Sequence, residues 1–116
     1  MCHILIIEDE AMTAADLEEI LAKEGATSFH FASTEGEAVV AAKVRRPDLI
    51  TSDVRLLEGT GPRAVDRIWN EVGQVPVIFI TGTPETCLPY APPGVIIVKP
   101  YASDGVAHAF RELAPL

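Results

Sequence analysis

The stretch HILIIEDE, residues 3–10, joins a short run of mostly apolar, branched side chains directly to three acids. A run that is apolar at nearly every position is typical of a strand buried on both faces of a parallel sheet. Three acids directly after such a strand are more than the start of a helix needs. The stretch therefore predicts a buried strand that carries a cluster of carboxylates at its carboxyl end.

Four further runs of this kind follow along the chain, at Ser28–Phe31, Leu49–Ser52, Val75–Ile80 and Val95–Val98. Amphipathic helical patterns lie between the runs, over Ala11–Glu24, Thr34–Arg46, Pro62–Val72 and Ser103–Leu113. The second run is more polar than the others, which suits an edge strand. Strands that alternate with helices predict an α/β fold, in which right-handed crossovers build a doubly wound parallel sheet with helices on both faces.

The helical patterns carry end signals, with one exception. Thr34 and Glu37 have the spacing of a capping box, and Ser103 is a predicted N-cap for the last helix. The exception is Gly82–Gly94, which contains four prolines. Because proline breaks helices, we expect the fourth helix of the alternation to be short or replaced by a proline-rich loop.

The composition describes one acidic globular domain. The chain has 116 residues, is 48% hydrophobic and carries a formal net charge of −8. This length fits a single domain over residues 1–116. An acidic chain repels nucleic acid and anionic membrane, so neither is an expected partner. The two cysteines lack metal-ligand spacing, and no membrane span or signal peptide is recognisable, so we expect a cytoplasmic protein.

Polar residues stand at the end of four of the five runs. They are Glu8-Asp9-Glu10, Asp53, Thr81-Gly82 and Lys99-Pro100. The carboxyl ends of parallel strands share one edge of the sheet, where such folds place their chemistry. Taken one at a time, acids at the start of a helix commonly serve only to stabilise that helix, and a lysine is commonly a solvated surface residue. The convergence of all four sets at one edge of the sheet favours a single functional site.

Carboxylates crowded into one site repel one another unless something neutralises them. Oxygen ligands select a hard cation, and a small site suits Mg²⁺. A carboxylate beside such an ion is a nucleophile towards phosphorus, and Asp53 fits this role because the next helix begins well beyond it. The Thr81 hydroxyl and the Lys99 ammonium group are placed to meet phosphoryl oxygens. Whether the Lys99-Pro100 peptide is cis stays open.

These motifs together resemble the receiver domain of two-component response regulators over essentially the whole chain. The stretches that carry the resemblance are Ile4–Asp9, Gly36–Ala38, Pro47–Asp53, Pro76–Thr81 and Lys99-Pro100. The resemblance implies a flavodoxin-like sheet of five strands in the order 2-1-3-4-5. It also implies that Asp53 is the phosphoacceptor, that Thr81 is the switch hydroxyl and that Lys99 grips the phosphoryl group.

The same resemblance implies a ligand set and partners. Asp9 would bind Mg²⁺ directly and Glu8 through water, with Asp53 and the backbone carbonyl of Arg55 completing the protein ligands. The phosphoryl donor would be a phosphohistidine on a sensor histidine kinase or a histidine phosphotransfer protein. The domain would be no enzyme beyond self-catalysed phosphorylation and dephosphorylation. It would be a monomer, with dimerisation on phosphorylation open, and would signal to a downstream protein or pass the phosphoryl group on.

The chain departs from usual receivers at two positions. Ile96 stands where a switch aromatic is common, and Tyr101 follows the Lys-Pro pair where Phe is common. The fourth run resembles FATGUY-type receivers, whose fourth strand reads Pro-Phe-x-Phe-Ala-Thr-Gly-Gly-Tyr. The matching residues are Pro76, Phe79, Thr81 and Gly82. That subfamily is known chiefly from alphaproteobacteria and serves general stress signalling, which is therefore the pathway that the resemblance implies.

Two other functions compete with the receiver. Haloacid-dehalogenase-type phosphatases also use an Asp nucleophile with Mg²⁺, but they carry a second acid two residues on. This chain has Arg55 there, which cannot donate a proton at neutral pH. A flavodoxin-like electron carrier would hold a flavin phosphate in its first loop, where Glu8-Asp9-Glu10 would repel it. The phosphatase is the main alternative.

Overall fold

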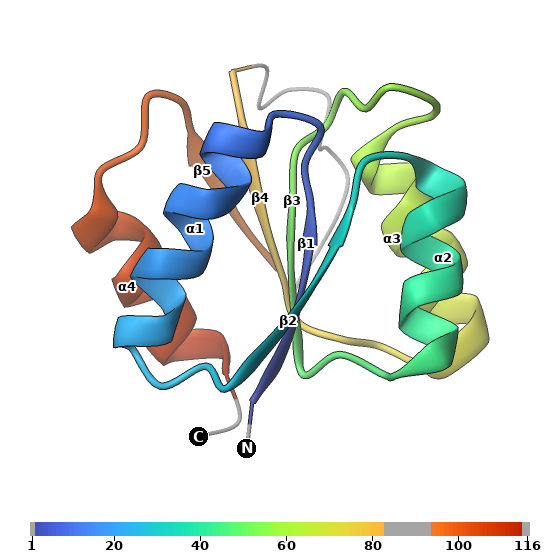
Figure 1. Ribbon diagram of the computed structural model, residues 1–116, viewed down its shortest axis with the longest axis horizontal. Helices are drawn as coiled ribbons and strands as arrows, with labels where there is room; N and C mark the ends of the chain where they lie inside the picture. Colours follow the sequence, from blue (N-terminus) through green and yellow to red (C-terminus); the bar gives the residue numbers. More distant parts are fainter. Residues whose placement is uncertain (1, 83–93, 115–116) are drawn as a thin grey trace.

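The computed structural model describes residues 2–82 and 94–114, which form one five-stranded sheet with helices on both faces (Figure 1). The strands are β1 (His3–Ile7), β2 (Ser28–Ala32), β3 (Leu49–Ser52), β4 (Val77–Thr81) and β5 (Gly94–Val98). Every neighbouring pair is parallel, and the order across the sheet is β2-β1-β3-β4-β5. The predicted fold class and strand order are therefore confirmed.

The described helices are α1 (Ala11–Lys23), α2 (Glu35–Val44), α3 (Gly61–Val72) and α4 (Ser103–Leu113). In Figure 1, α1 and α4 cover one face of the sheet, and α2 and α3 cover the other. Alternation along β1 builds both cores, because successive strand residues point to opposite faces. Ile4 and Ile6 pack in the core under α1 and α4, whereas Leu5 and Ile7 pack under α2 and α3.

Proline sets two element boundaries that differ from the predicted ones. Helix α2 ends at Val44, before the predicted Arg46, because a residue that precedes a proline disfavours the helical region. Strand β4 begins at Val77 rather than Val75, since Pro76 has no N–H for the ladder. It continues through Thr81, so this threonine is the last residue of the strand.

The capping predictions had different outcomes. The Thr34 hydroxyl accepts the Glu37 N–H at 3.1 Å, as expected, but the Glu37 carboxylate accepts the N–H of Ser33 rather than that of Thr34. The Ser103 prediction was wrong. Ala102 occupies the N-cap position of α4 without a side-chain bond, and Ser103 is the first helical residue.

The expected proline-rich loop at Gly82–Gly94 lies almost wholly outside the described residues, as does the question of a short fourth helix within it. The Lys99-Pro100 peptide is cis. Across 2–82 and 94–114, none of the helices combines the length and the apolar character that crossing a membrane requires.

Candidate functional site

The sheet brings the carboxylates of Glu8, Asp9 and Asp53 together. Ile7 of β1 pairs with Ser52 of β3, so the residues that follow these two strands leave the sheet side by side. One oxygen from each of the three carboxylates lies within 4.8 Å of the other two. All the donors are oxygens, which is the ligand chemistry of a hard divalent cation. The cluster therefore fits the predicted Mg²⁺ site.

Glu8 is the buried member of this cluster, with 5% of its surface exposed. Burial, and then the charge of Asp53, raise the pKa of Glu8 to about 7. The Glu10 N–H donates to Glu8 Oε1 at 3.2 Å, which offsets part of that effect. A cation beside Glu8 would stabilise the charged form of its carboxylate and so lower the pKa.

Lys99 supplies a positive charge to the same site. Its Nζ lies 3.2 Å from Asp53 Oδ2 and 3.9 Å from Glu8 Oε2. Burial alone would lower the pKa of Lys99, but the charge of Glu8 and the hydrogen bond to Asp53 outweigh it, so the pKa is raised. The lysine is therefore held charged between two of the predicted site carboxylates.

Thr81 and Arg55 lie on the elements that flank the cluster. Thr81 is buried at the end of β4, and its carbonyl accepts the N–H of Lys99 at 2.8 Å. Arg55 lies two residues beyond Asp53, where it forms an isolated antiparallel bridge with Thr60. The predicted roles of the Thr81 hydroxyl and of the Arg55 carbonyl stay predictions.

The residues that hold Asp53 in place were not predicted from the sequence. The Ser52 hydroxyl donates to the Asp53 carbonyl at 2.8 Å, and the Val54 N–H donates to Asp53 Oδ1 at 2.7 Å. Gly61 begins α3 so close to this peptide that an added Cβ would lie 1.8 Å from the Asp53 carbonyl oxygen. The glycine immediately before the predicted helix start at Pro62 was the available signal.

A hollow of about 300 Å³ opens beside the cluster between α1 and β2. Its lining residues are Glu8, Asp9, Ala11, Ala14, Ala15, Glu18, Phe31 and Ser33. Asp9, at one end of the hollow, is exposed, so the cluster is reachable from solvent on that side. This is a necessary property of a site that must meet a donor.

The fold and this arrangement define a class of small α/β domains with an acidic pocket and a lysine at the carboxyl edge of a doubly wound sheet. The response regulator receiver domain model matches residues 4–105. The chain therefore belongs to the response regulator receiver domain family, and it is a phosphoacceptor domain of that family rather than a haloacid-dehalogenase-type phosphatase.

Its relatives include longer regulators and a protein of similar length. The phyllosphere-induced regulator PhyR of Methylorubrum extorquens is 40% identical over 109 residues, covering 90% of this chain and 40% of PhyR. The transcriptional regulatory protein PdtaR of Mycobacterium tuberculosis is 34% identical over 79 residues, covering 68% of this chain and 38% of PdtaR. The chain thus spans about two fifths of these two proteins. The chemotaxis protein CheY of Bacillus subtilis is 30% identical, with 97% of this chain and 98% of CheY covered.

Solved structures agree with this assignment. The PhyR receiver domain of Erythrobacter litoralis superposes with a TM-score of 0.85 at 30% identity, covering 97% of this chain and 88% of that one. A PhyR described as a stress response regulator gives a TM-score of 0.76 at 37% identity, covering 97% of this chain and 44% of the other. The resemblance to stress-signalling receivers is therefore confirmed at the level of family.

Proposed function

We propose that Asp53 accepts a phosphoryl group from the phosphohistidine of a sensor histidine kinase or a histidine phosphotransfer protein. The observation that supports this proposal is the position of the Asp53 carboxylate beside those of Glu8 and Asp9 and 3.2 Å from the Lys99 ammonium group. A nucleophilic carboxylate needs a fixed position, and a transferred phosphoryl group needs positive charge near its oxygens.

The residues around Asp53 have separable tasks in this transfer. The Val54 N–H donates to Oδ1 and orients the carboxylate, while Lys99 lies beside Oδ2. In the step, a bond forms between an Asp53 oxygen and phosphorus, and the bond from phosphorus to the donor imidazole nitrogen breaks. Lys99 then pairs with a phosphoryl oxygen, and the hydroxyl of Thr81, at the end of the neighbouring strand β4, would do the same.

Glu8, Asp9, Asp53 and the carbonyl of Arg55 would hold Mg²⁺. When bound, this ion supplies neutralisation of charge on the phosphoryl oxygens. The crowding of the three carboxylates supports the assignment, because a cation offsets their mutual repulsion.

We infer the wider role from the likeness to the relatives. The likeness to PhyR favours general stress signalling, in which the phosphorylated domain contacts a downstream protein or passes its phosphoryl group on. A single receiver domain over residues 1–116, acting in the cytoplasm, fits this role. Self-catalysed phosphorylation and dephosphorylation would be its only reactions.

The test is labelling with acetyl phosphate and Mg²⁺, followed by intact mass. The wild-type chain should gain one phosphoryl group, and Asp53→Asn should gain none. Asp66→Asn is the matched control, since Asp66 is an exposed aspartate on α3 and should label like wild type. Equal labelling of Asp53→Asn and wild type would refute the assignment of Asp53.

A further inference from the structure

Within the described part of the chain, strand β2 has a free edge. It is the end strand of the sheet there and pairs with β1 on one side only. In Figure 1 it lies nearest the viewer, with neither α1 nor α2 crossing in front of it. An open edge offers unpaired backbone N–H and C=O groups to any extended chain of matching length.

The side chains of β2 do not protect this edge. Natural edge strands commonly carry lysine, proline or a bulge, which discourage pairing with another chain. The sequence of β2 is SFHFA, without a charge or a proline. His30 and Phe31 are both exposed, Phe31 at 45% of its surface. An edge strand of this composition is suited to pairing with a strand of another chain.

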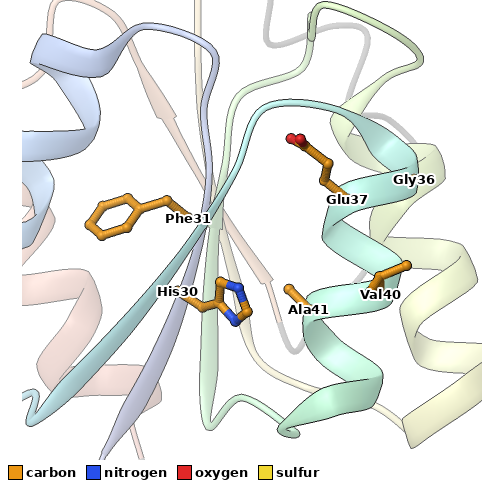
Figure 2. Close-up of a pocket in the computed structure, with 6 residues that line it drawn as sticks. All are labelled: His30, Phe31, Gly36, Glu37, Val40 and Ala41. Atoms are coloured by element: carbon orange, nitrogen blue, oxygen red, sulfur yellow. The ribbon is translucent and has the colours of Figure 1, made fainter.

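A hollow of about 370 Å³ runs along the α2 side of the edge (Figure 2). Its lining residues are His30, Phe31, Gly36, Glu37, Val40 and Ala41. Figure 2 shows His30 on the side of the strand that faces α2, and Phe31 on the opposite side. Val40 is 62% exposed, and Val44, one turn further along α2, is 74% exposed. The edge therefore adjoins apolar surface.

The two ends of β2 differ in charge. Glu37 lies at the Ala32 end, where its carboxylate accepts the N–H of Ser33. Arg45 and Asp48 lie near the Ser28 end, since both charges act on His3, the β1 residue that pairs with Ser28; Asp48 Oδ2 is engaged there with the His3 N–H. An antiparallel copy of β2 would bring each Glu37 end towards an Arg45 end, whereas a parallel copy would bring like ends together.

We propose that the free edge of β2 pairs antiparallel with β2 of a second copy of this chain, about a two-fold axis at His30. The pairing is isologous, because the same surface is used by both copies. It joins the two sheets into one and buries both β2 edges. This dimer is independent of Asp53 and replaces the monomer that the sequence led us to expect.

The register has specific consequences. With the axis at His30, the two His30 side chains lie opposite each other, and Phe29 of each copy lies opposite Phe31 of the other. Phe29 and Phe31 already stack within one strand, with ring centroids 6.5 Å apart. Cross-strand aromatic pairs stabilise sheets, and like charges directly opposite each other destabilise them.

The test measures molar mass by sedimentation over a range of concentrations. The wild-type chain should form dimers reversibly. His30→Lys and His30→Asp each place like charges on the axis, so the dissociation constant should rise at least about tenfold. Met12→Lys adds the same charge at an exposed apolar residue of α1, 88% exposed, and should dimerise like wild type.

Mixing the two His30 variants separates this interface from any other. Each variant repels itself, but Lys and Asp on opposite sides of the axis attract, so an equimolar mixture should recover dimers. Circular dichroism of each variant should match wild type, because His30 is exposed. A wild-type chain that stays monomeric at millimolar concentration would overturn the proposal, as would variants that dimerise unchanged or a mixture that fails to recover dimers.

Discussion

At the scale of single residues, burial of the charged Glu8 carboxylate lowers the free energy of unfolding. Its side chain is 1% exposed, and its positive neighbour among residues 2–82 and 94–114, Lys99, is shared with Asp53. A buried charge that its surroundings only partly offset destabilises the folded state. In metal-free buffer at pH 8, we therefore expect Glu8→Gln to stabilise the chain by about 1–3 kcal/mol in urea unfolding.

The same variant reports on the metal. Mg²⁺ that binds only the folded state raises the melting temperature of wild type. Glu8→Gln should melt higher than wild type in EDTA and respond less to Mg²⁺. Glu19→Gln removes an equal charge from an exposed residue of α1 and should leave both quantities unchanged. An unaltered Mg²⁺ response in Glu8→Gln would show that Glu8 takes no part in binding the ion.

His3 predicts a loss of stability in mild acid. Burial lowers its pKa from 6.5, with Arg45 and His30 adding to the effect and Asp48 opposing it. Nδ1 is 2.8 Å from the Ser28 hydroxyl, and among the described residues Nε2 has no hydrogen-bond partner. Because the unfolded chain takes up this proton first, stability is complete above pH 6.5 and falls as the pH drops below it.

The measurement is urea unfolding at pH 7.5 and at pH 5.5, for wild type and for His3→Asn. Other groups titrate in both proteins, so the informative quantity is the difference between the two proteins at each pH. Wild type should lose more stability than His3→Asn between pH 7.5 and 5.5. If the two lose the same amount, His3 is not the group responsible.

The sequence was sufficient to predict that the site acids and Lys99 lie together, but not to predict which contacts hold them in position. Glu8, Asp53 and Lys99 directly follow apolar runs and Asp9 follows Glu8, so the direction and order of the strands determine where these residues lie. The close approach of Gly61 to the Asp53 carbonyl depends on how α3 packs on the sheet, and so does, for α1, the hydrogen bond that the Tyr101 hydroxyl donates to the Asp16 carboxylate. A local pattern carries no information about such packing.

At the scale of elements, the start of α3 is fixed by the peptide of Asp53. The N–H of Gly61 donates to the Val54 carbonyl at 2.7 Å, and a Cβ at Gly61 would lie 1.8 Å from the Asp53 carbonyl and 2.4 Å from Ser52 Oγ. Any side chain there must displace the backbone of Asp53 or the helix. We expect Gly61→Ala to cost about 1–3 kcal/mol or more in urea unfolding.

Gly36→Ala is the matched control, because nothing lies within 4 Å of a Cβ at this position of α2. It should stabilise the chain by about 0.5–1 kcal/mol. In the folded protein, Gly61→Ala should also slow labelling by acetyl phosphate, whereas Gly36→Ala should not. Normal labelling and stability of Gly61→Ala would mean that α3 adjusts without moving Asp53.

Element boundaries were predictable where one residue determines them and not where packing does. Thr34 caps α2 as its spacing indicated. Ser103 has the right chemistry for a cap, yet α4 begins one residue earlier in the helical register and leaves its side chain without a cap bond. The N-cap position falls on Ala102, whose side chain cannot accept a hydrogen bond, so capping chemistry alone did not determine where α4 begins.

At the scale of the whole molecule, one side-chain contact links the lysine side of the site to α1. The Tyr101 hydroxyl donates to Asp16 Oδ2 of α1 at 2.5 Å, whereas Arg111 of α4 pairs with Glu24 at the other end of α1, at 2.6 Å. Tyr101 lies two residues after Lys99, and α1 begins directly after the acidic triplet. The Tyr101–Asp16 bond therefore closes a path from the lysine back to the acids.

This path predicts that Tyr101 positions Lys99. Tyr101→Phe keeps the ring that packs on the core and removes only the bond to Asp16, so the fold should survive. The segment that carries Lys99 becomes freer, and labelling of Asp53 by acetyl phosphate should slow by about threefold to tenfold, for a loss of about 0.7–1.4 kcal/mol. The affinity for Mg²⁺ should stay unchanged, because Lys99 is not a ligand.

Variants of Asp16 are the controls. Asp16→Ala should slow labelling as much as Tyr101→Phe does, whereas Asp16→Asn should retain most of the rate because its amide oxygen still accepts the bond. The double variant Tyr101→Phe/Asp16→Ala should be no slower than either single variant. Wild-type rates in Tyr101→Phe, or additive losses in the double variant, would show that the bond is only structural.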